Sequence, residues 1–159
     1  MGVNGHSVPN RMGWRVESGD RIGYWVADEL ELGFHSGRSA AIGLVKDDEI
    51  VAGVIYEGWN RRSIIAHIAI KGRMTPSFLA AIFDYPFNVC GVEKVICHVE
   101  IGNIESARLA ENMGFIPEAR LADCHPNGDI VLYTMKRADC RFLEDRYGQK
   151  INTSRASSS

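Results

Sequence analysis

The sequence predicts a mixed α/β fold, in which helices flank a sheet whose centre is partly parallel. Predicted strands outnumber predicted helices, and one strand in the middle of the chain is apolar almost throughout. A helical pattern follows this strand and another follows the next one, as in connections between parallel neighbours. For a chain of 159 residues we expect a single domain over residues 1–150, followed by a disordered polar tail over residues 151–159.

The first half of the chain predicts one helix and three consecutive strands. Residues 1–13 are rich in Gly, Asn and Pro and are expected to be irregular, whereas residues 18–32 contain apolar positions at helical spacing. Two apolar runs, at 40–46 and 50–59, flank the turn sequence Asp-Asp-Glu and predict a hairpin. The next strand, at 64–70, has the apolar composition of a strand covered on both faces.

The second half predicts a helix, a strand, a further helix and a hairpin. Thr75 can cap the first helix and Pro76 suits its first position, while Pro86 is expected to end or kink it. The remaining predicted elements are strands at 93–100, 115–123 and 129–136 and a last amphipathic helix near 138–147.

The helix between the strands at 93–100 and 115–123 has clear end residues. The side chain of Asn103 can accept a hydrogen bond from the first turn, and Gly114 suits the left-handed residue that ends a helix. The apolar positions predicted to face the core are Ile104, Ala107, Ala110 and Met113, with Leu109 beside them.

Composition and charge exclude some classes of protein. A net charge of −2 creates no overall positive field that would attract nucleic acid or a membrane surface. No apolar run is long enough to span a bilayer and the N-terminus lacks the apolar segment of a signal peptide, so a cytoplasmic location is expected. The four cysteines lack the spacing of a metal or disulfide site, and we expect reduced thiols that mostly fill the core.

The two strand–helix junctions point to a ligand site. If the strands at 64–70 and 93–100 are parallel neighbours, their carboxyl ends lie together, and ligands bind at such ends. Lys71 and Arg73 stand beside the first helix start, so an anion could bind there.

The motif N-x-x-S-x-x-L-x-E-x-x-G-F, from Asn103 to Phe115, and a later D-x-x-x-Y-x-M, with Asp129, Tyr133 and Met135, resemble a known family. Together with the order of the elements, they look like the GNAT superfamily of acyl-CoA N-acetyltransferases. The resemblance covers roughly residues 40–136 and is closest to the branch that includes ribosomal-protein N-terminal acetyltransferases. Phage Mom-type DNA-modification proteins are a remoter GNAT-like group.

This resemblance implies a GNAT-like mixed sheet of six to seven strands whose middle strands splay apart to hold acetyl-CoA as cosubstrate. The pantetheine would pair with the backbone of His67, Ile68, Ala69 and Ile70, and Asn103 and Ser106 would flank it. The residues implied to hold the pyrophosphate are Arg73, Met74, Thr75 and Ser77.

Three positions depart from the family pattern. Pro76 and Phe78 stand where the pyrophosphate loop has glycines, and proline removes a backbone donor. Ala110 stands where many members carry a tyrosine that protonates the leaving thiolate.

The implied reaction is direct attack of an amine on the thioester, with no covalent intermediate and no metal. The amine must lose a proton, so a base with a pKa near neutral is needed, and an unpaired backbone N–H could stabilise the oxyanion. His67 is the first candidate base, ahead of Glu57, His98 and Glu100. Tyr133 is a candidate donor to the leaving thiolate.

The sequence leaves the acceptor and the oligomeric state open. A small molecule, a protein N-terminus and a lysine are all candidate acceptors, and a homodimer is one candidate assembly. One alternative is a non-catalytic GNAT-like binding protein, which Pro76 and Ala110 would permit. A second is a nucleobase-modifying enzyme of Mom type, which the net charge does not favour, although five arginines could cluster in space: Arg11, Arg15, Arg61, Arg62 and Arg73. A third is an α/β domain without a cofactor.

Overall fold

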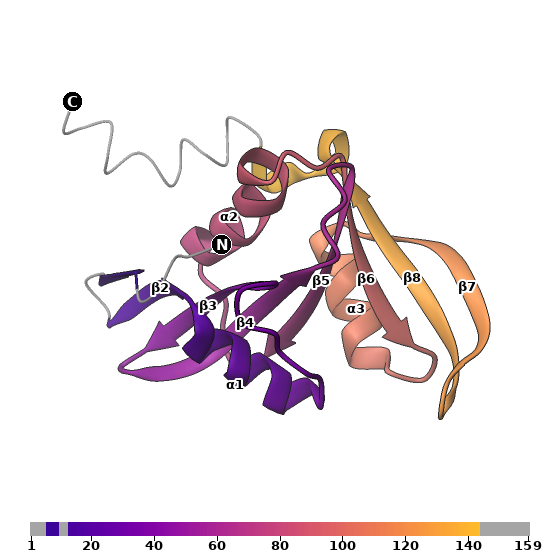
Figure 1. Cartoon of the computed structure of the whole chain (residues 1–159), viewed down its shortest axis with the longest axis horizontal. Coiled ribbons are helices and arrows are strands. Elements are labelled where there is room, and N and C mark those ends of the chain that lie inside the picture. The colour runs from indigo at the N-terminus through magenta and orange to yellow at the C-terminus, as the bar shows by residue number, and fades with distance from the viewer. Residues whose placement is uncertain (1–5, 10–12, 144–159) are drawn as a thin grey trace.

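The fold is an eight-stranded sheet with helices on both faces (Figure 1). It was obtained as a computed structural model, which describes residues 6–9 and 13–143. The strands lie in the order β1-β2-β3-β4-β5-β6-β8-β7. Their bounds are β1 His6–Pro9, β2 Trp14–Ser18, β3 Ala40–Lys46, β4 Glu49–Glu57, β5 Ser63–Ile70, β6 Lys94–Glu100, β7 Ile116–His125 and β8 Gly128–Lys136.

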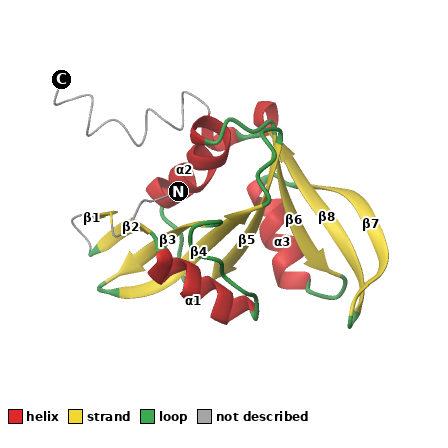
Figure 2. Ribbon diagram, in the orientation of Figure 1, coloured by secondary structure: helices red, strands yellow, loops and turns green. Residues whose placement is uncertain are grey.

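Two layers of helices cover this sheet (Figure 2). Helix α1 (Asp20–Leu30) packs on one face with the smaller group of buried side chains. Helices α2 (Pro76–Asp84) and α3 (Ile104–Met113) contribute to the larger core on the other face. Within the described residues, no helix has the length and apolar character needed to cross a bilayer.

The sheet divides between β5 and β6. These two strands are parallel, whereas the other neighbouring strands are antiparallel. Their pairing covers only Ser63 with Lys94, Ile64 with Val95 and Ile65 with Ile96. Beyond these pairs the strands diverge and form a V that opens downward in Figure 1. The parallel centre and the splayed middle strands are therefore confirmed.

Helix α1 lies close against the sheet because two glycines face it. A Cβ atom at Gly43 would lie 2.5 Å from Cδ1 of Ile22, and one at Gly53 would lie 2.6 Å from Cγ2 of Val26. Both Ile22 and Val26 are fully buried. The two glycines thus position the helix, whose end borders the V.

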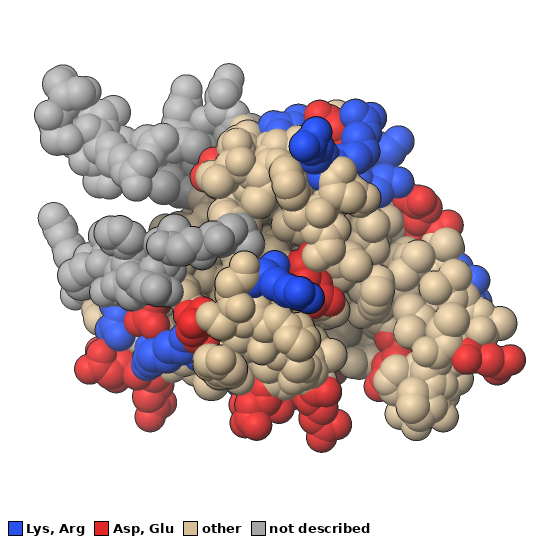
Figure 3. All heavy atoms as spheres, in the orientation of Figure 1, with Lys and Arg blue, Asp and Glu red and all other residues tan. Residues whose placement is uncertain are grey.

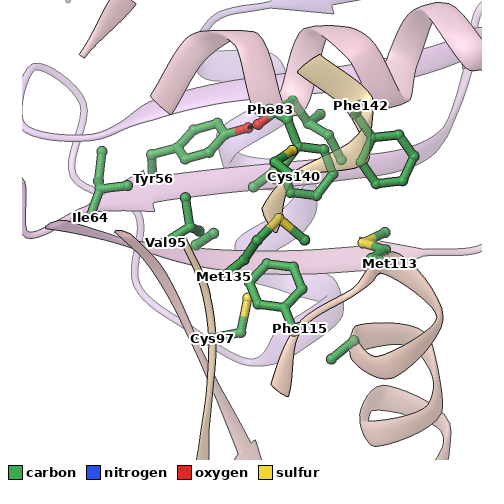
Figure 4. Close-up of a cluster of buried hydrophobic side chains, with 14 of the residues drawn as sticks. Tyr56, Ile64, Phe83, Val95, Cys97, Met113, Phe115, Met135, Cys140 and Phe142 are labelled. Carbon is green, nitrogen blue, oxygen red and sulfur yellow. Dashed lines mark hydrogen bonds between the residues drawn. The ribbon is translucent and has the colours of Figure 1, made fainter. Parts of the chain in front are cut away.

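The larger core closes the narrow end of the V. Figure 4 shows part of it, with Phe83 and Phe142 close together and Met135 near Phe115. The rings of Phe83 and Phe142 stack with centroids 4.7 Å apart, and the Tyr56 hydroxyl donates to the carbonyl of Ile82. Cys97 and Cys140 are buried here as expected, whereas Cys124 is exposed.

Three sequence predictions need correction. Residues 6–9 form strand β1 inside the segment 1–13 that was expected to be irregular, and residues 14–18 form strand β2, where no strand was predicted. Ile104 is 67% exposed because it is the first residue of α3, beyond the part of the helix that faces the core. The expected last helix is replaced, within the described residues, by two 3-10 turns on either side of Cys140, whose extended backbone interrupts helical geometry. The rest of that segment and the tail lie outside the described residues.

The predicted helix ends are confirmed. The side chain of Asn103 accepts a hydrogen bond from the Ser106 N–H, and Gly114 ends α3 with a left-handed backbone at φ 107°. Helix α2 begins after Thr75 and its α-helical part ends before Pro86, where the chain continues as one π-helical turn, Tyr85–Val89.

Candidate active site

Two adjoining cavities fill the V between β5 and β6. The first, of about 440 Å³, lies between Ala66–Ile68 of β5 and Cys97–Glu100 of β6. The second, of about 490 Å³, follows β5 from Ile68 to Lys71. Both are lined by Leu30, Ile68, Ser106 and Leu109, so they form one continuous cleft.

His67 and Glu57 form a hydrogen-bonded pair at the wall that β4 and β5 build. Nε2 of His67 lies 2.9 Å from Oε1 of Glu57. In the sheet, His67 stands opposite Ile55 and Glu57 opposite Ile65, so alternation places both side chains on the face that α1 covers. If Nε2 donates to the carboxylate, Nδ1 keeps a free lone pair. The structure thus brings together two of the predicted catalytic residues.

His98 faces His67 across the V. The two rings are nearly perpendicular, with centroids 6.3 Å apart. Burial lowers the pKa of His98 and the nearby His67 lowers it further, while Glu57 acts in the opposite direction. His98 is therefore neutral near pH 7 and adds no fixed positive charge to the cleft.

A second carboxylate–imidazole pair lies at the other wall. Nδ1 of His125, the last residue of β7, is 2.8 Å from Oε2 of Glu100 at the end of β6. The side-chain amide of Asn127 donates to the same Oε2 at 3.5 Å. His125 and Asn127 both line the first cavity, and sequence reasoning missed them. Only the hairpin, which returns along β6, brings the β7–β8 turn to the cleft.

The start of α3 closes the cleft. Asn103 and Ser106 line the first cavity, together with Ala110. The side-chain oxygen of Asn103 accepts the Ser106 N–H at 3.2 Å, which leaves the amide group of Asn103 as a donor. Both residues stand where the motif places them, between the cleft and the helix.

The start of α2 offers few free backbone donors. Pro76 has no N–H, and the Phe78 N–H donates to Oγ1 of Thr75 at 3.2 Å. The Leu79 N–H already donates to the Thr75 carbonyl at 3.1 Å, so the first turn leaves only the Ser77 N–H. Two cations lie nearby, since Arg73 is exposed and Lys71 forms an ion pair with Glu29 at 3.1 Å.

The residues predicted to hold the pyrophosphate lie outside the two cavities. Arg73, Met74, Thr75 and Ser77 belong to the segment that leads from β5 to α2, and Lys71 is the residue of that segment that lines the cleft. Ile68, Ala69 and Ile70, by contrast, line the second cavity. On its free edge, β5 has no strand partner from Ala66 onward among the residues that the structure describes.

Tyr133 does not lie in the cleft. It is buried, and its hydroxyl donates to Oε1 of Glu111 at 3.2 Å. Burial and this carboxylate raise the pKa of Tyr133. Tyr133 stands opposite Cys97 in the sheet and therefore shares the face that α3 covers, away from His67. This placement does not support Tyr133 as the donor to a leaving thiolate.

The comparisons with known proteins identify the fold. No protein-family model matches the chain, and no curated protein matches its sequence. A variant of spermidine N-acetyltransferase SpeG from Vibrio cholerae is 14% identical, with a TM-score of 0.65 over 84% of this chain and 98% of that one. A chimera of the Vibrio cholerae enzyme and hSSAT is 18% identical, with a TM-score of 0.56 over 69% of this chain and 73% of that one.

A probable acetyltransferase is also similar. It is 18% identical, with a TM-score of 0.55 over 64% of this chain and 63% of that one. Because these identities are low, the likeness concerns the path of the backbone and not individual residues. The eight-stranded sheet, split between β5 and β6, is therefore the fold of the GNAT acetyltransferases.

Proposed function

We propose that the protein is an acyl-CoA-dependent N-acetyltransferase that uses acetyl-CoA and an amine acceptor. The observation that carries this proposal is the end of β5–β6 pairing after Ile65, with the His67–Glu57 pair beside the opening. The similar structures carry the names of acetyltransferases, and two of them are named for spermidine, a small amine. These names favour a small-molecule acceptor over a protein.

The cleft has features that suit a thioester arm. From Ala66 to Ile70 the free edge of β5 presents backbone N–H and C=O groups that an amide-containing arm can pair with. The second cavity runs along this edge, and Ser106 and Leu109 of α3 line its other side. We assign His67, Ile68, Ala69 and Ile70 to the arm, and Asn103 and Ser106 to the opposite side.

The phosphates of coenzyme A would depend more on side chains than on backbone donors. Because the first turn of α2 leaves only the Ser77 N–H, the positive charges of Arg73 and Lys71 must supply most of the attraction. Thr75 is already engaged as the helix cap, and we assign Met74 only a packing role.

In this mechanism the acceptor enters from the α1 side of the sheet. Nδ1 of His67 takes a proton from the incoming ammonium, and the carboxylate of Glu57 stabilises the resulting imidazolium. The amine nitrogen then forms a bond to the thioester carbonyl carbon, and the carbon–sulfur bond breaks. An N–H on the free edge of β5 can donate to the carbonyl oxygen as negative charge develops. The attacking nitrogen releases its second proton to solvent, and coenzyme A leaves as the thiolate and takes a proton from solvent.

Thermal unfolding tests the proposal directly. Acetyl-CoA at 100 times its dissociation constant should add about 2.7 kcal/mol of apparent stability, while ATP at the same concentration should add little. Release of free thiol with a mixture of primary amines then tests turnover. No thermal shift at millimolar acetyl-CoA would contradict the proposal.

A second candidate is a GNAT-fold protein that binds coenzyme A esters without turnover. The observation in its favour is that Ala110 occupies a cavity-lining position while Tyr133 lies elsewhere, so no tyrosine among the described cavity residues can protonate the thiolate. A thermal shift with acetyl-CoA, but no thiol release with any amine, would support this candidate.

A further inference from the structure

The acceptor side of the cleft contains a second negative group whose role the acetyl transfer itself does not explain. Glu100 lies on the same face of β6 as His98, and it lines the first cavity. Its side chain is 30% exposed, so the carboxylate is partly shielded from solvent and yet reachable from the cleft. A chemical role for this group has to come from what the acceptor presents to it.

The carboxylate of Glu100 is held by one oxygen. His125 and Asn127 both contact Oε2, whereas no hydrogen bond to Oε1 occurs among the residues that the structure describes. The backbone nitrogen of Asn127 lies 3.1 Å from the same Nδ1 of His125, so Nδ1 either accepts from this N–H or, when protonated, donates to Glu100. The result is a positioned carboxylate with one acceptor oxygen free.

The charge around this oxygen favours a cation. The described residues that line the first cavity include Glu31 and Glu100 but neither Lys nor Arg. His98, two residues before Glu100 on the same face of β6, has a lowered pKa and does not neutralise the carboxylate near pH 7. Figure 3 shows the same tendency at larger scale, with Asp and Glu along the lower edge of the molecule, toward which the V opens.

The spacing suits two charges in one small molecule. His98 and Glu100 are two residues apart on β6, which corresponds to about 7 Å along the strand. The His98 ring is 6.3 Å from that of the proposed base, His67. An amine that reacts beside His67 can therefore reach Glu100 with a second nitrogen carried on a short chain of methylenes.

We infer that the acceptor is a primary amine with a second cationic group, and that Glu100, positioned by His125, binds this second group. The inference rests on the proposed acetyl transfer and adds a class of acceptor to it. A neutral substituent at this place would leave Oε1 of Glu100 without a partner and an anionic one would be repelled, so simple monoamines should bind poorly.

The first experiment compares amines on the full-length, unaltered protein. KM and kcat are measured with 1,3-diaminopropane, 1,4-diaminobutane and 1,5-diaminopentane, and with propylamine, butylamine and pentylamine as matched monoamines. At least one diamine should have a KM about tenfold or more below that of its monoamine, with a similar kcat, because a charge-assisted contact is gained on binding. Equal KM values for every pair would overturn the inference while leaving acetyl transfer intact.

The second experiment replaces the charge. Glu100→Gln keeps an amide oxygen for His125 and removes the negative charge, so KM for the preferred diamine should rise about tenfold while KM for the monoamine stays unchanged. The control is Glu118→Gln, which removes a carboxylate on β7 that pairs with Lys94 outside both cavities, and should change neither KM.

The outcomes separate the two proposals. No turnover with any amine, despite a thermal shift with acetyl-CoA, would reject the proposed function. Turnover with unchanged diamine preference in Glu100→Gln would reject only the role of Glu100, leaving this residue a structural tie to the β7–β8 turn. A thermal unfolding scan of the variant with acetyl-CoA shows that the cleft is still folded.

Discussion

At the scale of the residue, the bond between His67 and Glu57 decides which ring nitrogen faces the acceptor. Nε2 lies 2.9 Å from the carboxylate, so the tautomer that donates from Nε2 is stabilised and Nδ1 is free. The His67 side chain is 17% exposed, which limits competing contacts with water. A histidine on a strand has its tautomer fixed in this way only if the neighbouring strand supplies a carboxylate on the same face of the sheet.

Replacing the proposed base should slow the reaction without abolishing cosubstrate binding. His67→Gln is expected to lower kcat by about 100-fold or more, because general base catalysis contributes on the order of 10² to 10⁴. The dissociation constant for acetyl-CoA, measured by calorimetry, should change little since the arm contacts the backbone of β5. His35→Gln, in an exposed loop, is the control. An unaltered kcat would remove His67 from the mechanism.

His98 should make stability depend on pH. Burial and His67 hold its folded pKa below the ordinary value of 6.5, so the unfolded chain binds a proton more readily than the folded one. Its effect is absent above pH 6.5, and the penalty to stability grows as the pH falls from 6.5 toward the folded pKa. At pH values below both the folded and the unfolded pKa of His98, the stability penalty stays constant.

Urea unfolding of the unaltered protein and of His98→Gln measures this contribution. The loss of unfolding free energy between pH 7.5 and pH 5 should be smaller in the variant. An identical loss in the two proteins would mean that the pKa of His98 is not lowered by folding.

At the scale of the element, α1 is placed by the sheet residues beneath it. Gly43 and Gly53 leave room for Ile22 and Val26, and the helix end then supplies Leu30 and Glu31 to the first cavity. The acceptor side of the cleft thus depends on two positions in β3 and β4 that contact no substrate.

Adding a methyl group under α1 should destabilise the fold. A Cβ at Gly43 would come within 2.5 Å of the Ile22 side chain, so Gly43→Ala is expected to cost about 1–3 kcal/mol of unfolding free energy. Urea unfolding measures this cost, with Gly33→Ala as a control where the nearest atom is 3.7 Å away. Equal stability of the two variants would show that α1 shifts without cost.

The start of α2 makes a separate prediction about cosubstrate binding. Arg73→Ala should weaken binding of coenzyme A about tenfold, because one charge-assisted contact to phosphate is lost and the helix start offers little to replace it. Calorimetry at low and high salt should also show a weaker salt dependence in the variant. Arg108→Ala, on the exposed side of α3, is the control. Unchanged affinity would place the phosphates away from Arg73.

At the scale of the whole molecule, the V exists because the two halves of the sheet are held together only at one end. Three residue pairs join β5 to β6, and the larger core packs behind them. Strands β8 and β7 then add to the far edge of β6, so their turn reaches the open end of the V. A sheet with continuous pairing would have neither the cleft nor the second carboxylate–imidazole pair.

Much of this arrangement was predictable from local patterns. Apolar runs marked β3, β4, β5, β6 and β8, and cap residues such as Thr75, Asn103 and Gly114 marked where α2 and α3 begin or end. Strands β1 and β2 were not predicted, because their stability comes from the pairing of β1 with β2 and of β2 with β3 and not from an apolar pattern of their own. Ile104 was assigned to the core because helical spacing does not show where along a helix the contact with the sheet begins.

The sequence by itself therefore determined the elements from α1 to β8 and their order, the parallel centre of the sheet and the motif that resembles the GNAT superfamily, since these depend on periodicity and on cap residues close together in the chain. The tertiary structure decided which side chains share the cleft. It pairs His67 with Glu57 and His125 with Glu100. It also places Tyr133 on the opposite face of the sheet from His67, in contact with Glu111. Such contacts join residues on separate strands, and they depend on register and on the divergence of β5 and β6, which no local pattern records.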